Sequence, residues 1–347
     1  MSPTSEFRYN PLDGRWVILA PERSKRPQNF ANWVPKTTDL DSNCPFCPGK
    51  EHLTTIELLR LGTSHAAGWT VRTVANRYPL LQVEGNVTRT AQGPFGFQSG
   101  VGAHEVVIET PDHTNLWHCR KPDENFLVLA AWRFRLLDLA KDSRLRHFQV
   151  FSNVGALAGA TLDHPHSQVV ASSIVPVDTM ARLSRYHFHW AKTERCLCCD
   201  IVNFEESQKH RIVIDDHDFC VFCPYASTSP FSMLFVPKRH EAQFSMATEA
   251  EITKLANLLS KGLSAYAAST GNAHYNLILH TSPPGAQHEE HHSGDILKWE
   301  RTHWYIELIS RYITLGGYEL STATAVNDVL PEEAAAHMRA LLLRRGN

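Results

Sequence analysis

The chain has 347 residues, of which 43% are hydrophobic and 20% charged, and its formal net charge at pH 7 is −2. A near-neutral chain of this size can bury a large core, and it lacks the strong field that attracts nucleic acids or membrane surfaces. No apolar run of about 18 residues is present, so no transmembrane helix is predicted, and Met1–Arg8 lacks the pattern of a signal peptide. We therefore expect a cytoplasmic protein that binds neither nucleic acid nor membrane.

The cysteine spacing points to metal binding. Eight cysteines are present, and in a cytoplasmic chain they are not expected to form a disulfide framework. Cys44–Cys47 and Cys196–Cys199 both have the Cys-x-x-Cys spacing of metal ligands, and the chain also contains 20 histidines, so zinc is the expected metal. A third such pair, Cys220–Cys223, lies in an apolar, strand-like run and is predicted to be a pair of buried structural thiols.

The first half of the chain alternates strands with one long helix. Strands are predicted at His104–Thr110, which is followed by His113, and at Phe148–Ser152, with a helix at about Asp123–Lys141 between them. The helix is expected to bury a face with the helical period that includes one polar residue: Phe126, Leu129, Ala130, Arg133, Leu136, Leu137 and Ala140.

The second half repeats this order. A strand at Phe231–Pro237 is followed by His240, and a helix begins at Thr248, where Glu251 completes a capping box. Two more strands are expected, at Tyr275–His280 and Thr302–Leu308. Stretches rich in Pro and Gly predict loops at 21–38, 91–101 and 281–298, and a final helix is expected at 331–345.

Superimposing the two halves pairs their cysteines and histidines. Cys44, Cys47, His113 and His164 match Cys196, Cys199, His240 and His303. Each set is Cys2His2, which is typical of a closed, structural zinc site. We therefore expect a duplicated chain with a catalytic half at 1–180 and a half with a structural metal at 181–347. The alternative is a chance similarity of two segments whose cysteines and histidines are unrelated.

The segment His164-Pro165-His166-Ser167-Gln168 carries the candidate chemistry. Residues two apart on an extended strand point to the same face, so the two imidazoles are expected to lie together. An imidazole can attack phosphorus without first losing a hydroxyl proton, which makes His166 a candidate nucleophile, and Gln168 can donate to a phosphoryl oxygen. The matching position in the second half is Tyr305, so that half is expected to lack a nucleophile.

Two other segments are candidates for binding phosphate. Arg23–Arg26 has three cations in four residues, and the fork of an arginine matches phosphate oxygens. Asn153–Thr161 follows a strand, and its glycines would let backbone N–H groups approach an anion. Neither the Walker Lys-Ser/Thr nor the GxGxxG pattern occurs there. Gly316–Glu319 predicts a tight turn of structural character.

The motif order resembles a known family. Cys-x-x-Cys, Pro-Asp-His, Asn-(x)5-Gly-x-Thr, His-Pro-His-x-Gln and Gly-Tyr-Glu occur as in the galactose-1-phosphate uridylyltransferase family of the histidine-triad superfamily, and the resemblance runs from Asn10 to Glu319. It implies an α+β fold, in which a duplicated histidine-triad-like unit forms an antiparallel half-barrel sheet with outer helices. It also implies a homodimer with active sites near the subunit interface.

The resemblance further implies a double displacement. His166 would attack the α-phosphorus of a nucleotide sugar, hexose 1-phosphate would leave, and the nucleoside monophosphate would pass to a second acceptor. Gln168 would stabilise the phosphoryl group, while His164 would bind zinc. The residues implied to contact nucleotide or phosphate are Arg23, Arg26, Asn76, Asn153, Gly159 and Thr161, and those implied to face the sugar are Tyr318 and Glu319.

Three functions remain open from the sequence. The first is transfer of uridylyl from UDP-glucose to galactose 1-phosphate, in galactose metabolism. The second is an ADP-glucose phosphorylase that uses phosphate as acceptor, because the second Cys2His2 set resembles that of a plant member. The third is a non-catalytic, zinc-scaffolded nucleotide-binding module, which would leave His166 and Gln168 unexplained. Two structural zinc ions per chain are expected, and iron is the alternative for the second.

Overall fold

One large antiparallel sheet organises the molecule. The computed structural model describes residues 5–25, 44–63, 66–271, 274–286, 288–290, 296–312 and 315–345. The sheet has ten strands, and every neighbouring pair is antiparallel. From edge to edge the strands are β10 (Ile212–Asp215), β11 (Phe219–Phe222), β12 (Met233–Pro237), β16 (Tyr305–Ser310), β13 (Tyr275–His280), β8 (His147–Val154), β9 (His166–Ser172), β7 (Gly102–Ile108), β4 (Val71–Ala75) and β3 (Glu57–Leu61).

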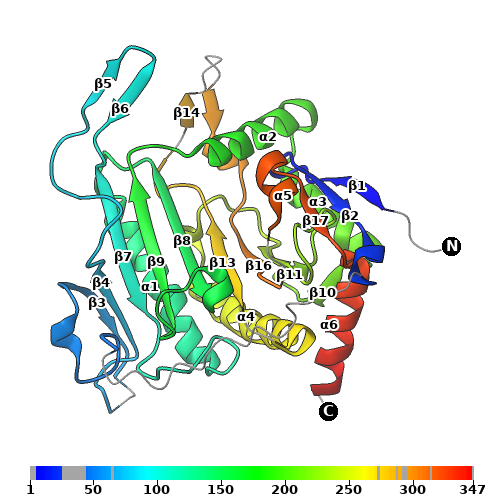
Figure 1. Ribbon diagram of the computed structural model, residues 1–347, viewed down its shortest axis with the longest axis horizontal. Helices are drawn as coiled ribbons and strands as arrows, with labels where there is room; N and C mark the ends of the chain where they lie inside the picture. Colours follow the sequence, from blue (N-terminus) through cyan, green and yellow to red (C-terminus); the bar gives the residue numbers. More distant parts are fainter. Residues whose placement is uncertain are drawn as a thin grey trace.

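The two halves of the chain meet in the middle of this sheet, where β13 pairs with β8 (Figure 1). The five strands on one side of this junction come from the second half of the chain and the five on the other side from the first half. The expected α+β class with an antiparallel sheet is confirmed. The division into two units at residue 180 stays a prediction, since both halves share one sheet.

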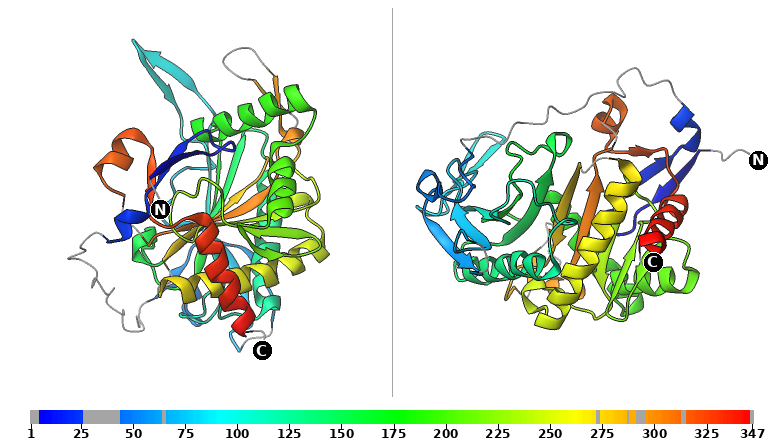
Figure 2. Two further views of the ribbon diagram at one scale, coloured as in Figure 1. Left: turned by 90° about the vertical axis from the view of Figure 1, so that its right-hand side faces the viewer. Right: turned by 90° about the horizontal axis from the view of Figure 1, so that it is seen from below.

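Two long helices cover one face of the sheet and bury the main core. They are α1 (Pro122–Leu139) and α4 (Glu249–Thr270), which pack against each other; α4 runs obliquely to α1 in the right-hand view of Figure 2. Trp132 of α1 and Leu259 of α4 are fully buried in the same cluster as Val150 and Leu277 of the sheet. The N-terminus of α4 has the predicted capping box between Thr248 and Glu251.

The opposite face of the sheet differs between the halves. On the C-terminal half it is covered by α2 (Val177–Thr193) and α3 (Leu197–Gln208), whose Tyr186 and Val202 pack on Leu234 and Tyr305. On the N-terminal half the same face packs against Phe46 and carries the candidate site. Among the described residues, no helix is long and apolar enough to cross a membrane.

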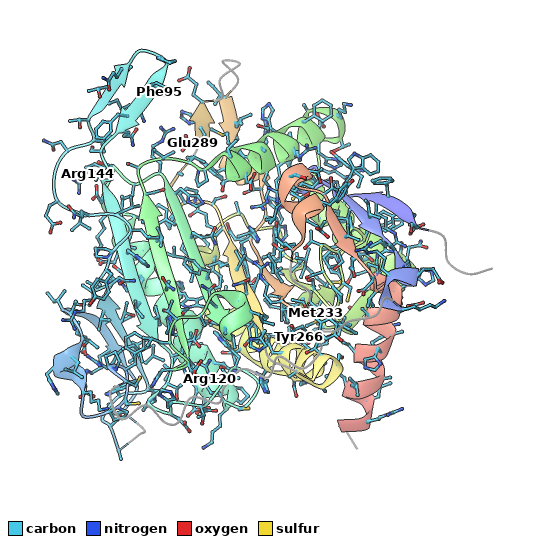
Figure 3. The ribbon with its side chains drawn as sticks, viewed as in Figure 1. Phe95, Arg120, Arg144, Met233, Tyr266 and Glu289 are labelled. Carbon is cyan, nitrogen blue, oxygen red and sulfur yellow. The ribbon has the colours of Figure 1, made fainter. Side chains whose placement is uncertain are left out.

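Smaller elements lie around the sheet. β1 (Glu6–Tyr9) and β2 (Trp16–Leu19) join β17 (Ala325–Asn327) in a three-stranded sheet, next to α5 (Gly317–Thr322) and α6 (Pro331–Arg345). The loop predicted at 91–101 is instead part of a hairpin, β5 (Arg89–Gln92) and β6 (Phe95–Gln98), which projects from the body with Phe95 exposed (Figure 3). The loop predicted at 281–298 contains a second hairpin, β14 (His288–Glu290) and β15 (Ile296–Lys298).

The buried face of α1 differs from the predicted one. Leu137 is 40% exposed, whereas Arg135 is buried and forms a bidentate ion pair with Glu105 of β7, with both N···O distances at 2.7 Å. A charged residue therefore occupies a position on the buried face that a purely apolar stripe would assign to solvent.

Candidate active site and metal centres

The first predicted set of metal ligands converges in space. His113 Nδ1 lies 3.4 Å from Cys47 Sγ, and His164 Nδ1 lies 3.6 Å from the sulfurs of Cys44 and Cys47. A tetrahedral zinc ion with ordinary bond lengths places sulfur and nitrogen ligands about 3.6 Å apart. The four donors therefore fit a zinc ion in type and in spacing, and all their ligand atoms lie within 4.8 Å of one another.

A main-chain carbonyl selects the tautomer of His164. Its Nε2 lies 2.7 Å from the carbonyl oxygen of Thr110, which can only accept, so Nε2 carries the proton and Nδ1 keeps its lone pair toward the sulfurs. Burial also lowers the pKa of His164 to about 4, which favours the neutral ring that a metal requires.

The second predicted set has the same construction. His303 Nδ1 lies 3.5 Å from Cys199 Sγ and 3.9 Å from Cys196 Sγ, and His240 Nδ1 lies 3.6 Å from Cys199 Sγ. His303 Nε2 donates to the carbonyl oxygen of Pro237 at 2.9 Å. Pro237 lies three residues before His240, just as Thr110, whose carbonyl accepts from His164, lies three residues before His113. The repeat therefore extends to the carbonyl partners of the ligands.

A cavity of about 490 Å³ lies beside the first metal group. His166 begins β9 at its wall, with 7% of its surface exposed. We call this cavity the His166 pocket. Its walls are mainly apolar and comprise Pro45, Phe46, Leu53, Thr54, Thr55, Val74, Ala75, Asn76, Arg77, Tyr78, Val106, Thr161, Leu162, His166 and Gln168.

The ring of His166 is oriented for attack from Nε2. Its Nδ1 lies 2.8 Å from the carbonyl oxygen of His164, so Nδ1 carries the proton. Nε2 then keeps its lone pair. Phe46 packs edge-on against both imidazoles, with ring centroids 5.9 Å from His164 and 5.5 Å from His166. The two histidines are neighbours but serve different centres, one the metal group and one the pocket.

His104, which was not among the predicted site residues, orients the amide of Gln168. The backbone N–H of Leu80 donates to His104 Nδ1 at 3.1 Å, so Nε2 carries the proton. This nitrogen donates to Gln168 Oε1 at 2.7 Å, the shorter of its two contacts, and also lies 3.1 Å from Asn76 Nδ2. Burial lowers the pKa of His104, which keeps the ring neutral. Because the carbonyl end of Gln168 is occupied, its NH2 is the end left for a ligand. Val106 pairs with Gln168 across β7 and β9, so His104, two residues before Val106, lies diagonally opposite Gln168. This strand register is the signal that would have revealed the contact.

Most of the predicted phosphate-binding residues lie at or near this pocket. Asn76, Thr161 and Gln168 line it together with His166. Ser152 and Ser167 are paired across β8 and β9, so the next residues, Asn153 and His166, lie opposite each other. Gly159 ends a short 3-10 turn just before Thr161, with a φ of 83° that favours glycine.

The remaining predicted residues lie elsewhere in the same chain. Arg23 is exposed in the 3-10 turn Pro21–Lys25, and Arg26 lies outside the described residues. Gly316–Glu319 was predicted to be a tight turn, but Tyr318 and Glu319 belong to α5. α5 leads into β17, which pairs with β2, and Figure 1 shows these elements away from β9.

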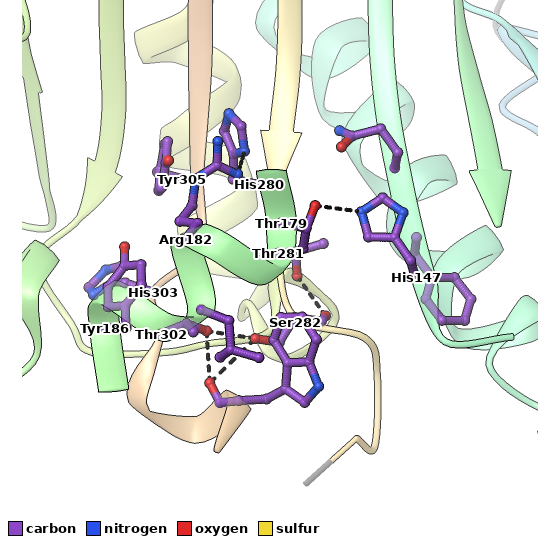
Figure 4. A pocket seen from close by; sticks show the side chains of 14 residues that line it. His147, Thr179, Arg182, Tyr186, His280, Thr281, Ser282, Thr302, His303 and Tyr305 are labelled. Atoms are coloured by element: carbon purple, nitrogen blue, oxygen red, sulfur yellow. Dashed lines mark hydrogen bonds between the residues drawn. The ribbon is translucent and has the colours of Figure 1, made fainter. Parts of the chain in front are cut away.

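The second half has a different set of side chains at the equivalent place (Figure 4). Tyr305 occupies the position of His166 and stacks on His280, with ring centroids 4.5 Å apart. Arg182 Nη1 donates to His280 Nδ1, and His280 Nε2 donates to Glu307 Oε2, both at 2.8 Å. Burial raises the pKa of Tyr305, so its hydroxyl is a poor nucleophile. Only the first half therefore has an imidazole where the nucleophile is expected.

Family models and relatives agree with this architecture. Models of the N-terminal and C-terminal domains of galactose-1-phosphate uridyl transferase match residues 2–176 and 180–344. An ADP-glucose phosphorylase from Arabidopsis thaliana is 32% identical over 97% of this chain and 93% of its own length. A galactose-1-phosphate uridylyltransferase from Saccharomyces cerevisiae is 26% identical over 98% of this chain and 95% of its own length.

Solved structures show the same similarity. A crystal structure of an ADP-glucose phosphorylase from Arabidopsis thaliana with bound ADP-glucose has a TM-score of 0.80 and 30% identity, covering 97% of this chain and 98% of that one. A uridylyltransferase structure has a TM-score of 0.72 and 25% identity, covering 98% and 99%. Fold, site and relatives together define a nucleotidyltransferase. The chain belongs to the galactose-1-phosphate uridyl transferase family.

A buried histidine at the start of β8 should make stability depend on pH. Burial lowers the pKa of His147 to about 4. The unfolded chain takes up its proton near a pKa of about 6.5, so stability is lost as the pH falls from about 6.5 toward 4. We expect His147→Gln to lose less stability between pH 7 and pH 5 than the unchanged protein, by about 2 kcal/mol, in urea unfolding.

The control is His217→Gln, because the side chain of His217 is 93% exposed. This variant should follow the pH dependence of the unchanged protein. Equal slopes for the His147 variant and the unchanged protein would contradict the assignment.

Proposed function

We propose that the protein moves a nucleoside monophosphate between a nucleotide sugar and hexose 1-phosphate through a nucleotidyl-His166 intermediate. UDP-glucose and galactose 1-phosphate are the leading substrate pair. The observation that carries this proposal is the orientation of His166, whose Nδ1 donates to the His164 carbonyl and leaves the Nε2 lone pair for attack. Family membership favours an enzyme over a non-catalytic zinc-scaffolded module.

The two steps balance without an external base. Nε2 of neutral His166 forms a bond to the α-phosphorus while the bond to the hexose 1-phosphate oxygen breaks, and hexose 1-phosphate leaves with the electron pair. The ring becomes positively charged, and the His164 carbonyl that accepts from Nδ1 stabilises this charge. A phosphate oxygen of the second acceptor then attacks the phosphorus and restores the neutral imidazole. The NH2 of Gln168 donates to the transferred phosphoryl group in both steps.

A second candidate function is an ADP-glucose phosphorylase. The relative with that activity is 32% identical, compared with 26% for the yeast uridylyltransferase. In this case phosphate would take the place of the second hexose 1-phosphate, and the same residues would act. A panel that pairs UDP-glucose and ADP-glucose with galactose 1-phosphate and phosphate separates the two, since the preferred pair should turn over fastest.

Removing the nucleophile should abolish the intermediate. With a nucleotide sugar labelled at the α-phosphate, the unchanged protein should retain label that is labile in acid and stable in base. His166→Gly should retain none, and turnover should fall by at least about 10⁴-fold, the scale expected when a covalent nucleophile is lost. His217→Gly, which removes an exposed imidazole, is the matched control.

If no nucleotide sugar labels the unchanged protein, or if His166→Gly keeps full turnover, the covalent route is wrong. Tight binding of a nucleotide sugar without any labelling would instead support the non-catalytic module.

We propose that each Cys2His2 group holds a structural zinc ion. The donor types and spacings support this. Zinc at the first group would hold His164, and so would also fix the carbonyl that orients His166. It takes no part in the chemical steps.

Metal content tests this proposal. The purified protein should contain about two zinc ions per chain, and Cys44→Ser and Cys196→Ser should each lose about one. Cys119→Ser, which alters an exposed cysteine, should lose none. Elemental analysis that also counts iron decides the identity of the second metal, and zinc near zero in the unchanged protein would reject both assignments.

We propose a homodimer in which a second copy completes the site. Arg23, Tyr318 and Glu319 lie away from the His166 pocket in one chain, and Glu319 lines a separate cavity of about 390 Å³. Light scattering on active fractions should therefore give twice the mass of one chain, and Glu319→Gln should raise the KM for the sugar phosphate. A fully active monomer would contradict this arrangement.

A further inference from the structure

A side chain from the second half of the chain contacts the candidate site of the first half. Asn276 lies on β13, directly across from Asn153 in the strand pairing, and only 6% of its surface is exposed. Its Nδ2 lies 2.7 Å from Asn153 Oδ1 and 2.9 Å from the carbonyl oxygen of Ala158. Its Oδ1 accepts from Nε of Arg311. All three polar contacts of this amide are therefore made within the protein.

The orientation of Asn276 follows from its partners alone. A guanidinium can only donate, and a main-chain carbonyl can only accept. The oxygen of Asn276 must therefore face Arg311, and its NH2 must face Ala158. The second hydrogen of that NH2 then points at Asn153, which has to offer its oxygen. Arg311 and the Ala158 carbonyl each have a fixed polarity, so together they decide which end of the Asn276 amide is oxygen.

This polarity decides what Asn153 presents to a ligand. With Oδ1 occupied by Asn276, the NH2 is the end of Asn153 that remains, and no acceptor for it is found in the described part of the chain. Asn153 lies opposite His166 across β8 and β9. A transferred phosphoryl group carries negative charge on its oxygens, so it is stabilised by an NH2 and repelled by an amide oxygen.

Gln168 is held by its oxygen in the same way as Asn153. Gln168 accepts at Oε1 from His104, which leaves its NH2 for the ligand. Two amides next to His166 are thus held at their oxygen ends by donors from neighbouring strands. One donor comes from the first half of the chain and the other from the second.

We propose that Asn276 is a positioning residue for phosphoryl transfer, which sets the amide of Asn153 with its NH2 toward the phosphoryl group and is itself held by Arg311. The inference rests on the proposed function, because it concerns the group transferred to His166. It assigns the second half of the chain a role at the active site through Asn276, which does not itself touch substrate.

A double-mutant cycle tests this role. The rate constant for labelling of His166 is measured in single turnover with saturating nucleotide sugar for the unchanged protein, Asn276→Ala, Asn153→Ala and the double variant. Loss of one oriented donor to a developing oxyanion costs about 10²- to 10³-fold in rate, and Asn276→Ala, which leaves the Asn153 amide in place but no longer oriented, should cost at least about tenfold. In the Asn153→Ala background the same substitution should cost less than about twofold, because it acts through Asn153.

A merely structural role predicts a different pattern. It would make Asn276→Ala equally costly in both backgrounds, and this result would overturn the proposal, as would an unchanged rate for Asn276→Ala. The dissociation constant of the nucleotide sugar should change little, because the walls of the His166 pocket are not altered. Ile278→Val, which shortens a side chain two residues further along β13, is the control and should keep the full rate.

A second pair of variants covers the case in which Asn276→Ala fails to fold. Arg311→Lys keeps a donor for the oxygen of Asn276 and should keep most of the rate, whereas Arg311→Ala should lower it. Equal rates for these two variants would also overturn the proposal. If the unchanged protein is never labelled at His166, the proposed function fails first, and that result is distinct from a labelled protein whose rate is insensitive to Asn276.

Discussion

Main-chain carbonyl oxygens determine which nitrogen is free in three histidines of the candidate centres. Thr110 serves His164, Pro237 serves His303, and His164 in turn serves His166. Because a carbonyl only accepts, each ring is protonated on the nitrogen that faces it, and the opposite nitrogen keeps a lone pair. His164 and His303 thereby offer Nδ1 to their Cys2His2 groups, while His166 offers Nε2. The same type of backbone group thus orients two candidate metal ligands and the candidate nucleophile, and the difference lies in which side of the ring it meets.

The second half of the repeat has no imidazole at the position of the candidate nucleophile. Its Tyr305 and Glu307 stand where His166 and Gln168 stand in the first half, and His280 packs between Tyr305 and Glu307. This half keeps its metal ligands and its place in the sheet. Because β13 pairs directly with β8, Asn276 of the second half contacts Asn153, which lies opposite His166. Shared strand pairing, rather than a second active centre, links the two halves.

The sequence predicted well whatever depends on local spacing. The strand at Tyr275–His280 and the helix at Pro331–Arg345 have the predicted bounds, and both metal sets converge as the repeat indicated. In each case the signal is a period, a cap or a ligand spacing within a short stretch. The matching order of the halves also predicted the second ligand set, because its cysteines and histidines follow the order of the first set.

Contacts between distant residues could not be predicted in this way. The pairs formed by Arg135 with Glu105 and by His104 with Gln168 join residues 30 and 64 positions apart, and Asn276 and Asn153 are 123 apart. A hydrophobic period assigns polar residues to solvent, so it misplaces a buried charge such as Arg135, whose loss of partner would cost about 3–5 kcal/mol. These pairs depend on strand order and register, which a single sequence does not specify.

Within one chain, the donors around His166 are mostly neutral. Within the described lining of the His166 pocket, Arg77 is the one arginine or lysine, and it is exposed. The amides of Gln168 and Asn153, which lie on the strand of His166 and opposite it on β8, are held at their oxygen ends. Only a contact that is stronger in the transition state than in the ground state speeds the chemical step. Oriented dipoles favour the charge that develops during transfer without trapping the intermediate, since their worth depends on direction and distance rather than on net charge.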